Sequence, residues 1–329
     1  MKPAALSTLL LSTIPLSAGC VAEEDDPGAL EFRTTIVCNG CGGVSNSPSV
    51  NDFPLPEINL VGLFNADGIK VKGIRSPIDN TLHTLRVVDD ELVAGTGGSH
   101  GTKFYPVATT SALIGWRIEL EGPGHAIDHA HILGYTDLSS WAAGGAAMSA
   151  YAIAYRDADQ PEHPFVNVCP EVDSPYETSV TVIAGETYDR ELKTVHPGMT
   201  NWVTLACAAE AVFKMKRLAY GPNAKLGSTG VVATVAQRQA TLKMLTADYC
   251  GTGDSYTNQG FPLLWKDKSG VDDTFAGTVM TEARWNENGA TCLTRPRLVD
   301  LDDVACAPAL PPCVDSAPLT DEWVTGVHP

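Results

Sequence analysis

The fold class is indicated by residues 113–120, which read Leu113-Ile114-Gly115-Trp116-Arg117-Ile118-Glu119-Leu120. Apolar side chains recur at every second position, so one face of an extended chain would carry Ile114, Trp116, Ile118 and Leu120. The opposite face would carry Arg117 and Glu119. This two-residue period is typical of a strand with one buried face, so the stretch predicts a β-strand.

Further strands are expected on both sides of this stretch. Residues 148–156 repeat the two-residue period, and turn-forming residues divide the region 58–157 into short runs. Strand character continues at residues 180–183, 263–266 and 279–285. Short strands at this spacing predict a β-sandwich or a partly open barrel.

Two stretches have the spacing of helices instead. Residues 204–218 and 231–245 each carry apolar side chains on one helical face, and a Gly- and Pro-containing segment between them would turn the chain back. We therefore expect a helical hairpin over residues 204–245 in a mainly β, α+β fold. Cys207 opens the first expected helix and Cys250 closes the second, so the hairpin predicts a Cys207–Cys250 disulfide. Such a bond contributes about 2–4 kcal/mol to stability.

The first 19 residues have the features of an export signal. Lys2 precedes an apolar run at residues 4–16 that is too short to span a bilayer. Cys20 directly follows the small residues Ser17-Ala18-Gly19, an arrangement that resembles the lipobox of bacterial lipoproteins, although that pattern usually has Leu in the place of Ser17. The resemblance implies a lipidated Cys20 and a membrane anchor. Ordinary secretion, with Cys20 as a spare thiol, is the alternative.

The chain has nine cysteines, an odd number for an exported protein. If Cys20 carries lipid, eight remain for four disulfides in an oxidising compartment. Cys38 and Cys41 would close one small loop, and Cys306 and Cys313 would close another. Zinc at Cys38 and Cys41 is the competing interpretation, but the chain lacks a second cysteine pair at similar spacing.

These features divide the chain into five parts. In order, they are a signal peptide at 1–19, a lipidated cysteine with an acidic, Pro-rich tether at 20–57, a β-rich region at 58–157, a domain with the helical hairpin at 158–305, and a Pro-rich tail at 306–329.

The composition excludes several functions. The chain has 22 basic and 39 acidic residues, with a formal net charge of −17. This balance argues against binding to nucleic acid and against docking on anionic headgroups by charge. No second apolar run is long enough for a transmembrane helix. The Gly-rich segment at 95–98 lacks the helix and lysine of a phosphate-binding loop, and no cofactor is expected.

Residues 246–257 read Thr246-Ala247-Asp248-Tyr249-Cys250-Gly251-Thr252-Gly253-Asp254-Ser255-Tyr256-Thr257. This stretch resembles the signature of the ADYC-domain family, a group of exported bacterial proteins named for the tetrapeptide at 247–250. Matching segments surround Cys169, Cys207 and Cys292, so the resemblance covers roughly residues 150–300. It implies a family without implying a particular activity.

Departures from the family pattern bear on the disulfides and the loop. The family often has cysteines where this chain has Met215 and Thr241, which would pair in the same antiparallel register as Cys207 and Cys250. By elimination, the remaining pair would be Cys169 with Cys292. The family also tends to have His at position 256, where this chain has Tyr, so His-based proton transfer is not expected in this loop.

The densest set of candidate metal ligands is His125, Asp128, His129 and His131. On a helix His125 and His129 would share a face, whereas on a strand His129 and His131 would do so. Either geometry suits a transition metal, but the spacing of a zinc hydrolase is absent. A histidine-rich loop without metal is therefore the preferred interpretation.

Asp248, Asp254 and Asp267, with glycines between them, form a candidate calcium loop, although their spacing matches no EF-hand. The alternative is that Asp248 forms a cap or an ion pair. Ser255 beside Asp254 is interpreted as a turn residue. Trp265 and Trp285 are expected in the core.

We expect a lipoprotein of the bacterial outer membrane, because Val21 after Cys20 resembles lipoproteins that move on from the inner membrane. Its domain would bind an envelope protein or glycan without catalysis, and the lipid would be its contact with the membrane. The alternative is an envelope hydrolase that uses the histidine cluster or the loop at Asp248 and Asp254. An enzyme requires these side chains to converge in a pocket, which distinguishes the two hypotheses.

Overall fold

The computed structural model describes residues 44–45, 47–48, 50, 55–98, 103–155, 164–169, 179–258, 261–275, 280–315 and 318–327. The expected signal peptide, Cys20, and the Cys38–Cys41 pair lie outside these residues. No helix within the described ranges is long and apolar enough to cross a membrane.

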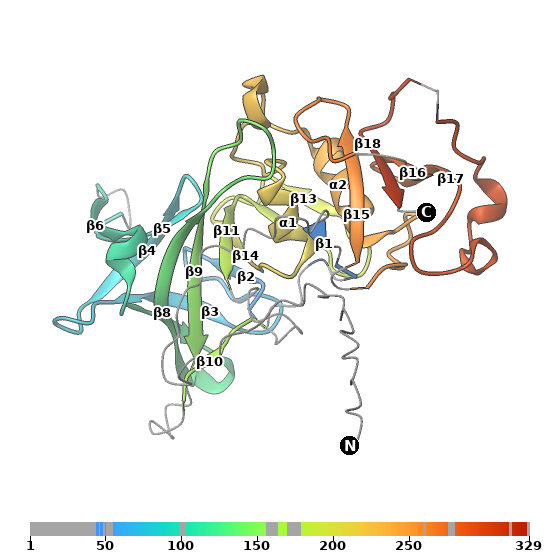
Figure 1. Cartoon of the computed structure of the whole chain (residues 1–329). Helices are drawn as coiled ribbons and strands as arrows, with labels where there is room; N and C mark the ends of the chain where they lie inside the picture. The colour runs from blue at the N-terminus through green and yellow to red at the C-terminus, as the bar shows by residue number, and fades with distance from the viewer. Residues whose placement is uncertain are drawn as a thin grey trace, which may run out of the picture. The chain divides into compact units, whose positions relative to one another are not determined.

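Most of the described strands belong to one antiparallel sheet (Figure 1). Its strands, in spatial order, are β2 (Glu57–Asn59), β14 (Trp202–Cys207), β11 (Val180–Ala184), β9 (Met148–Tyr155), β8 (Ile127–Leu138), β7 (Arg117–Glu121), β3 (Lys70–Arg75), β4 (Leu82–Val88), β5 (Glu91–Thr96) and β6 (Tyr105–Thr109). The short β10 (Val166–Asn167) pairs with β9. The expected strands at 113–120, 148–156 and 180–183 correspond to β7, β9 and β11. β7 starts later than expected, because a 3-10 turn occupies Thr110–Leu113 and leaves Ile114 exposed.

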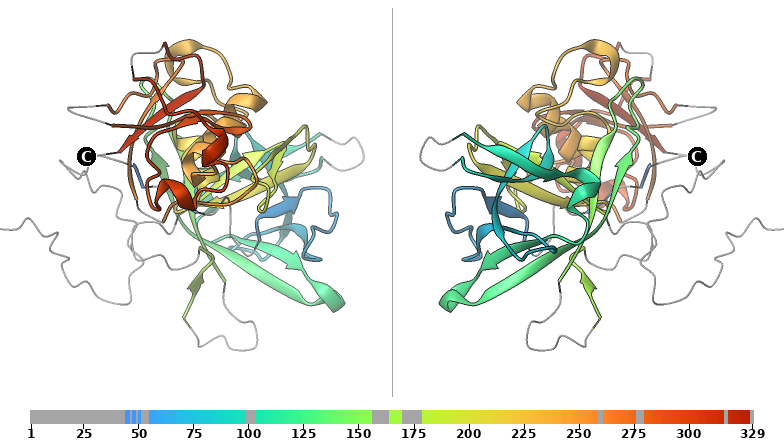
Figure 2. Two further views of the ribbon diagram at one scale, coloured as in Figure 1. Left: turned by 90° about the vertical axis from the view of Figure 1, so that its right-hand side faces the viewer. Right: turned by 90° about the vertical axis from the view of Figure 1, so that its left-hand side faces the viewer.

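This sheet curls around its own apolar core, and Figure 2 shows its strands from two opposite directions. The amide of Leu92 on β5 donates a hydrogen bond to the hydroxyl oxygen of Tyr151 on β9 (3.0 Å), although β5 and β9 are not neighbours in the sheet. The described end strands, β2 and β6, do not pair with each other, so the curl is not closed into a barrel. The prediction of a mainly β fold with two helices is confirmed.

A second antiparallel sheet is built from both ends of the described chain. Its order is β1 (Val44–Ser45), β15 (Pro262–Asp267), β18 (Trp323–Val327), β16 (Met280–Asn286) and β17 (Gly289–Leu293). The prediction of a Pro-rich tail at 306–329 is wrong for Trp323–Val327. These residues form β18, the middle strand of this sheet, and Trp323 is fully buried. The expected tether is wrong for β1 and for Val50, which is 1% exposed in the core. Trp265 and Trp285 are also buried, as expected.

The two helices are shorter than expected. The segment 204–207 belongs to β14, because Val203 pairs with both β2 and β11, and Leu205 pairs with β11 while its amide donates to the carbonyl of Pro56 (2.9 Å). Helix α1 spans only Ala211–Arg217. Helix α2 (Val235–Thr246) starts at a capping box in which the Thr234 side chain accepts from the Gln237 amide. The helices contact each other, α1 also contacts β14, and α2 also contacts β16, β17 and β18.

The described cysteines form three disulfides, Cys169–Cys207, Cys250–Cys306 and Cys292–Cys313. The predicted pairings Cys207–Cys250, Cys169–Cys292 and Cys306–Cys313 are wrong. The physical reason is that Cys207 ends a strand of the large sheet instead of opening a helix, and the register argument fails with it. The large sheet also runs across the expected boundary between residues 157 and 158, since β9 pairs with β11.

Candidate functional site

The signature tetrapeptide at 247–250 forms the end of α2 and the turn after it. Ala247 has a left-handed backbone (φ 51°), and the helix ends before it. Ala247, Asp248 and Tyr249 are almost completely buried, and Cys250 is bonded to Cys306. The first three residues of the tetrapeptide therefore pack into the protein, and Cys250 is partly exposed.

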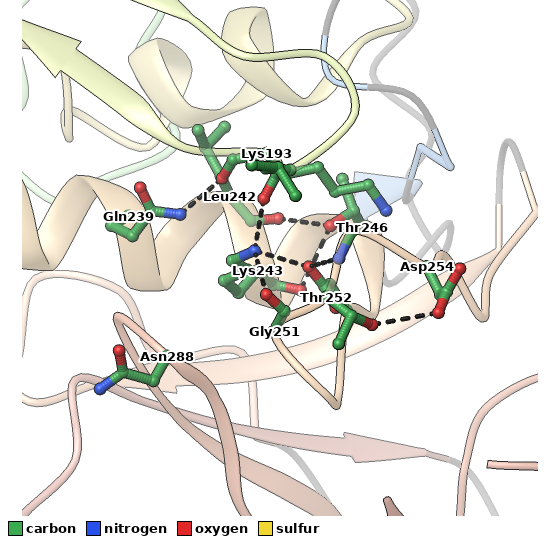
Figure 3. A network of polar contacts seen from close by, with 12 residues as sticks. Lys193, Gln239, Leu242, Lys243, Thr246, Gly251, Thr252, Asp254 and Asn288 are labelled. Carbon is green, nitrogen blue, oxygen red and sulfur yellow. Dashed lines mark hydrogen bonds and ion pairs between the residues drawn. The ribbon is translucent and has the colours of Figure 1, made fainter. Parts of the chain in front are cut away.

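Asp248 is held by a buried lysine. Lys243 Nζ lies 2.6 Å from Asp248 Oδ2 and also donates to the carbonyl oxygens of Leu192 (2.7 Å) and Gly251 (3.2 Å; Figure 3). The amide of Gly253 donates to the same carboxylate oxygen (2.9 Å). The ammonium group thus finds three acceptors inside the protein, whereas the other carboxylate oxygen, Asp248 Oδ1, is buried without a hydrogen-bond partner among the described residues. The ion pair shapes the loop after α2.

Tyr249 belongs to a second buried network. Arg297 forms a bidentate ion pair with Glu282, with Nε–Oε1 and Nη2–Oε2 distances of 2.6 and 3.0 Å. The Tyr249 hydroxyl donates to Glu282 and accepts from the Arg297 amide. Burial raises the pKa of Tyr249 well above its usual value, so the phenol stays protonated. The aspartate and the tyrosine of the signature thus both form buried polar contacts that stabilise the fold.

The side chains of Lys193 and Ser255 meet beside these networks. Lys193 lies in the turn between β12 (Glu186–Tyr188) and β13 (Val195–Pro197), is 3% exposed, and its Nζ donates to Ser255 Oγ. The pKa of Lys193 is lowered to about 8. Burial is the largest cause and nearby Lys243 acts in the same direction, whereas Asp248 and Asp254 oppose the shift. Ser255 is half-buried and donates to the carbonyl oxygen of Pro48. A buried lysine beside a serine hydroxyl can act as a base that activates the hydroxyl as a nucleophile.

Helix α2 and the signature loop position this pair. Gln239 accepts from the amide of Val195 (2.8 Å) and donates to the carbonyl of Lys193 (Figure 3). Gly253 (φ +99°) lies against the same turn, because a Cβ there would be 2.0 Å from the carbonyl oxygen of Glu191. Sequence reasoning missed Lys193, which is 62 residues from Ser255 and belongs to no motif.

The candidate calcium ligands do not converge. Asp254 is exposed and accepts from Thr252 (3.0 Å), whereas Asp248 is enclosed by its lysine. Asp267 lies elsewhere, where it accepts from the hydroxyl of Tyr220 (2.9 Å) and two backbone amides. Within the described ranges, no group of three or more His, Cys, Asp or Glu residues has a geometry that could hold a metal ion.

The histidine cluster lies on β8 and the turn before it. His129 and His131 share one strand face, with ring centroids 6.3 Å apart, as expected for a strand. His125 points to Glu121 instead (Nδ1–Oε1 2.7 Å), and Asp128 is exposed. Burial lowers the pKa of His129, and the charge of Arg117 adds to this effect. The four side chains therefore do not surround a common point.

A cleft with a volume of about 920 Å³ lies in the large sheet and its loops. It is lined by residues of β3, β4, β11 and β14 and by nearby loops: Leu60, Val61, Gly62, Lys70, Val71, Lys72, Thr84, Arg86, Val87, Gly98, Ala184, Gly185, Asn201, Trp202, Val203 and Asn223. No carboxylate side chain is among these residues, although the chain has a net charge of −17. Sequence reasoning missed this cleft, because its lining residues come from two segments, 60–98 and 184–223, that are far apart in the sequence.

The charged and aromatic side chains of the cleft come from opposite walls. Lys70 and Lys72 on β3 each place Nζ 3.0 Å from an oxygen of Glu121, and Arg86 on β4 donates to the carbonyl of Gly98. Trp202 starts β14 on the other wall and is half-buried. The cleft thus combines cations, amides and one indole, a set that can bind polar, anionic molecules.

The ADYC domain model matches residues 110–299. This match covers more than half of the chain, so the protein belongs to the ADYC-domain family. No curated protein and no solved structure matches the chain. The matched residues include Lys193, the signature loop and the Trp202 wall of the cleft, but not its Lys70 and Arg86 wall.

Proposed function

We propose that this protein is an exported lipoprotein, anchored through Cys20 to the outer membrane, whose domain binds acidic glycans of the cell envelope in the 920 Å³ cleft. The main support for glycan binding is the set of side chains that line this cleft. Three cationic side chains and no carboxylate line it, in a chain with 39 acidic residues. A concave site of this size suits several sugar rings.

The chemistry of the lining matches a carboxylated sugar. Arg and Lys bind carboxylates through charge-assisted hydrogen bonds, and the side-chain amide of Asn201 can donate to and accept from hydroxyl groups. Asn223 offers its side-chain oxygen as an acceptor, because its amino group already donates to Asp90 Oδ1 (2.7 Å) and to the carbonyl of Ala184 (2.9 Å). The half-buried indole of Trp202 offers an apolar surface for the C–H face of a sugar ring. A hydrolase built on the histidine cluster or on Asp248 and Asp254 has less support, because those side chains do not converge.

Binding is tested by calorimetry with two oligosaccharides of equal length, one neutral and one in which alternate sugars are uronic acids. We expect the acidic oligosaccharide to bind more tightly, with an affinity that falls as salt rises. Trp202→Ala and Arg86→Met should each weaken binding about tenfold or more, which corresponds to about 1.4 kcal/mol. Lys225→Met, an exposed lysine outside the cleft, is the matched control. Equal affinity for both oligosaccharides, or no effect of Trp202→Ala, would contradict the proposal.

The anchor is tested separately by the intact mass of protein extracted from membranes with detergent. We expect lipid mass on Cys20 and loss of membrane association in Cys20→Ser. Reduction should add eight hydrogens, two for each of the three described disulfides and two for Cys38–Cys41. An unmodified amino terminus at residue 20 would exclude the anchor.

A further inference from the structure

We propose that Lys193 and Ser255 form a base–nucleophile pair that hydrolyses acyl esters, an activity separate from glycan binding in the cleft. Two buried lysines in this region differ in the hydrogen-bond acceptors that surround their ammonium groups. Lys243 donates to one carboxylate and two carbonyl oxygens. Lys193 is as deeply buried, yet among the described residues it forms no ion pair within 4.0 Å, and its side chain contacts the Ser255 hydroxyl.

The backbone at Lys193 is held in a conformation that a lysine rarely adopts. Its φ of 55° lies in the left-handed region, which is unfavourable for a residue with a side chain. Gln239 and Lys243 of α2 bind the carbonyls of Lys193 and Leu192 and hold this turn. Strain supported in this way is common where a side chain must be placed for chemistry.

The charged groups that face Lys193 come from α2 and from the signature loop. Lys243 favours the neutral amine, whereas Asp248 and Asp254 favour the ammonium form, and burial is the largest influence. Because these effects bring the pKa to about 8, a substantial fraction of the amine is neutral in mildly alkaline solution. A base with a pKa near the working pH is suited to proton transfer.

The proposed reaction follows from this arrangement. Neutral Lys193 accepts the hydroxyl proton of Ser255 while Oγ attacks the ester carbonyl carbon. The C–O bond of the ester breaks, and the leaving alcohol takes the proton from Lys193. Water then attacks the acyl-serine, again giving a proton to Lys193, which returns it to Ser255 as the carboxylic acid leaves. In the resting structure the Ser255 proton is directed to the carbonyl oxygen of Pro48, which a substrate must displace.

The test is labelling of the full-length protein with a fluorophosphonate probe, followed by peptide mapping, together with hydrolysis of p-nitrophenyl acetate. We expect the adduct on Ser255 and a labelling rate that rises with pH to a plateau, with a midpoint near 8. Ser255→Ala should abolish labelling, and Lys193→Met should lower the rate at least about 100-fold. Thr252→Ala, which removes an exposed hydroxyl from the same loop, should leave labelling unchanged.

Two further measurements separate catalysis from a structural role. Lys193→Met removes a buried amine whose lowered pKa destabilises the fold at neutral pH, so its Tm at pH 7 should equal or exceed that of the unchanged protein. Lys193→Arg keeps the charge but cannot act as a base, and it should remain unlabelled. A folded protein with no adduct on Ser255 at any pH between 6 and 10, or equal labelling in Lys193→Met, would overturn the proposal.

Discussion

The large curled sheet and the region around α2 satisfy their polar groups in different ways. In the sheet, neighbouring strands pair their backbone groups, and the lysine of a charged pair such as Lys72–Glu121 reaches solvent, with the lysine side chain 40% exposed and the glutamate side chain 6% exposed. Around α2, carbonyl groups of the loops and of the last turn of the helix accept hydrogen bonds from buried cations. Lys243 donates to Leu192 O, and Arg297 donates to Met244 O (3.1 Å). Loss of a charge should therefore destabilise the second region far more than the first.

The largest effect is expected from Arg297→Met. The substitution leaves Glu282 and Tyr249 buried without their cation, which should lower the free energy of unfolding by about 3–5 kcal/mol. The matched control is Lys266→Met, which breaks an ion pair with Asp273 in which both side chains are 45% exposed, and it should cost about 0–1 kcal/mol. Urea denaturation measures both. Equal losses of unfolding free energy in Arg297→Met and Lys266→Met would contradict the expected difference between buried and exposed ion pairs.

The disulfides should rank by the length of the loop they close. Cys250–Cys306 joins residues 56 apart and Cys292–Cys313 joins residues 21 apart. Replacing both cysteines of a pair by serine should cost about 4 and about 3 kcal/mol, respectively, on loop-closure entropy. Urea denaturation of the two double variants under non-reducing conditions compares them. A larger loss for the shorter loop would show that native-state packing dominates over chain entropy.

A smaller effect, which depends on pH, is expected at Asp272. Burial raises the pKa of Asp272 to about 8, and the charge of Asp267 adds to this rise. A carboxyl group with a raised pKa stabilises the fold fully below its unfolded pKa near 4 and loses that contribution as the pH rises through about 8. Asp272→Asn should therefore remove a few kcal/mol of this pH dependence, measured as the free energy of unfolding between pH 4 and 9. If the free energy of unfolding of Asp272→Asn depends on pH as steeply as that of the unchanged protein, another group causes the pH dependence.

The smallest effect is expected at the surface of the large sheet. His125, Lys70 and Lys72 lower the pKa of Glu121 to about 2. Because the pKa is lowered, the stabilising contribution is present above pH 4.5 and is lost as the pH falls towards 2. Glu121→Gln should lower Tm modestly at pH 7, where the charged carboxylate stabilises the fold, and should flatten the fall between pH 5 and 2, so that the two proteins have similar Tm values near pH 2. A fall in Tm with decreasing pH that is equally steep in Glu121→Gln and in the unchanged protein would contradict this assignment.

Strands and core aromatics followed well from sequence patterns. β7 and β9 lie where the two-residue period predicts strands, but the expected contrast between a buried and an exposed face is wrong: Met148–Ala154 of β9 are all buried, and Glu119 and Glu121 of β7 are buried as well. Trp265 and Trp285 are buried for the same reason that any large apolar side chain is. The helix boundary near 204 was wrong, because Val203 and Leu205 suit a strand as well as a helix, and pairing with two neighbouring strands decides between them.

The candidate site was less predictable. Asp248 was correctly considered as an ion-pair residue, but its partner Lys243 and the neighbouring Lys193 carry no sequence signal. Cysteine pairing failed because it depends on which loops meet, as with Cys250 and Cys306, and not on spacing. β18 was overlooked because the prolines before it obscured the alternation at Trp323–Val327.

By itself, the amino-acid sequence determined the mainly β class, the export-signal hypothesis, the ADYC-domain family and most strand positions, since these depend on local periodicity and short motifs. Only the tertiary structure decided the disulfide partners, the cleft beside Trp202 and the contact between Lys193 and Ser255. Each of these joins segments far apart in the chain. Their meeting depends on how whole sheets and helices bury apolar surface, which no local pattern records.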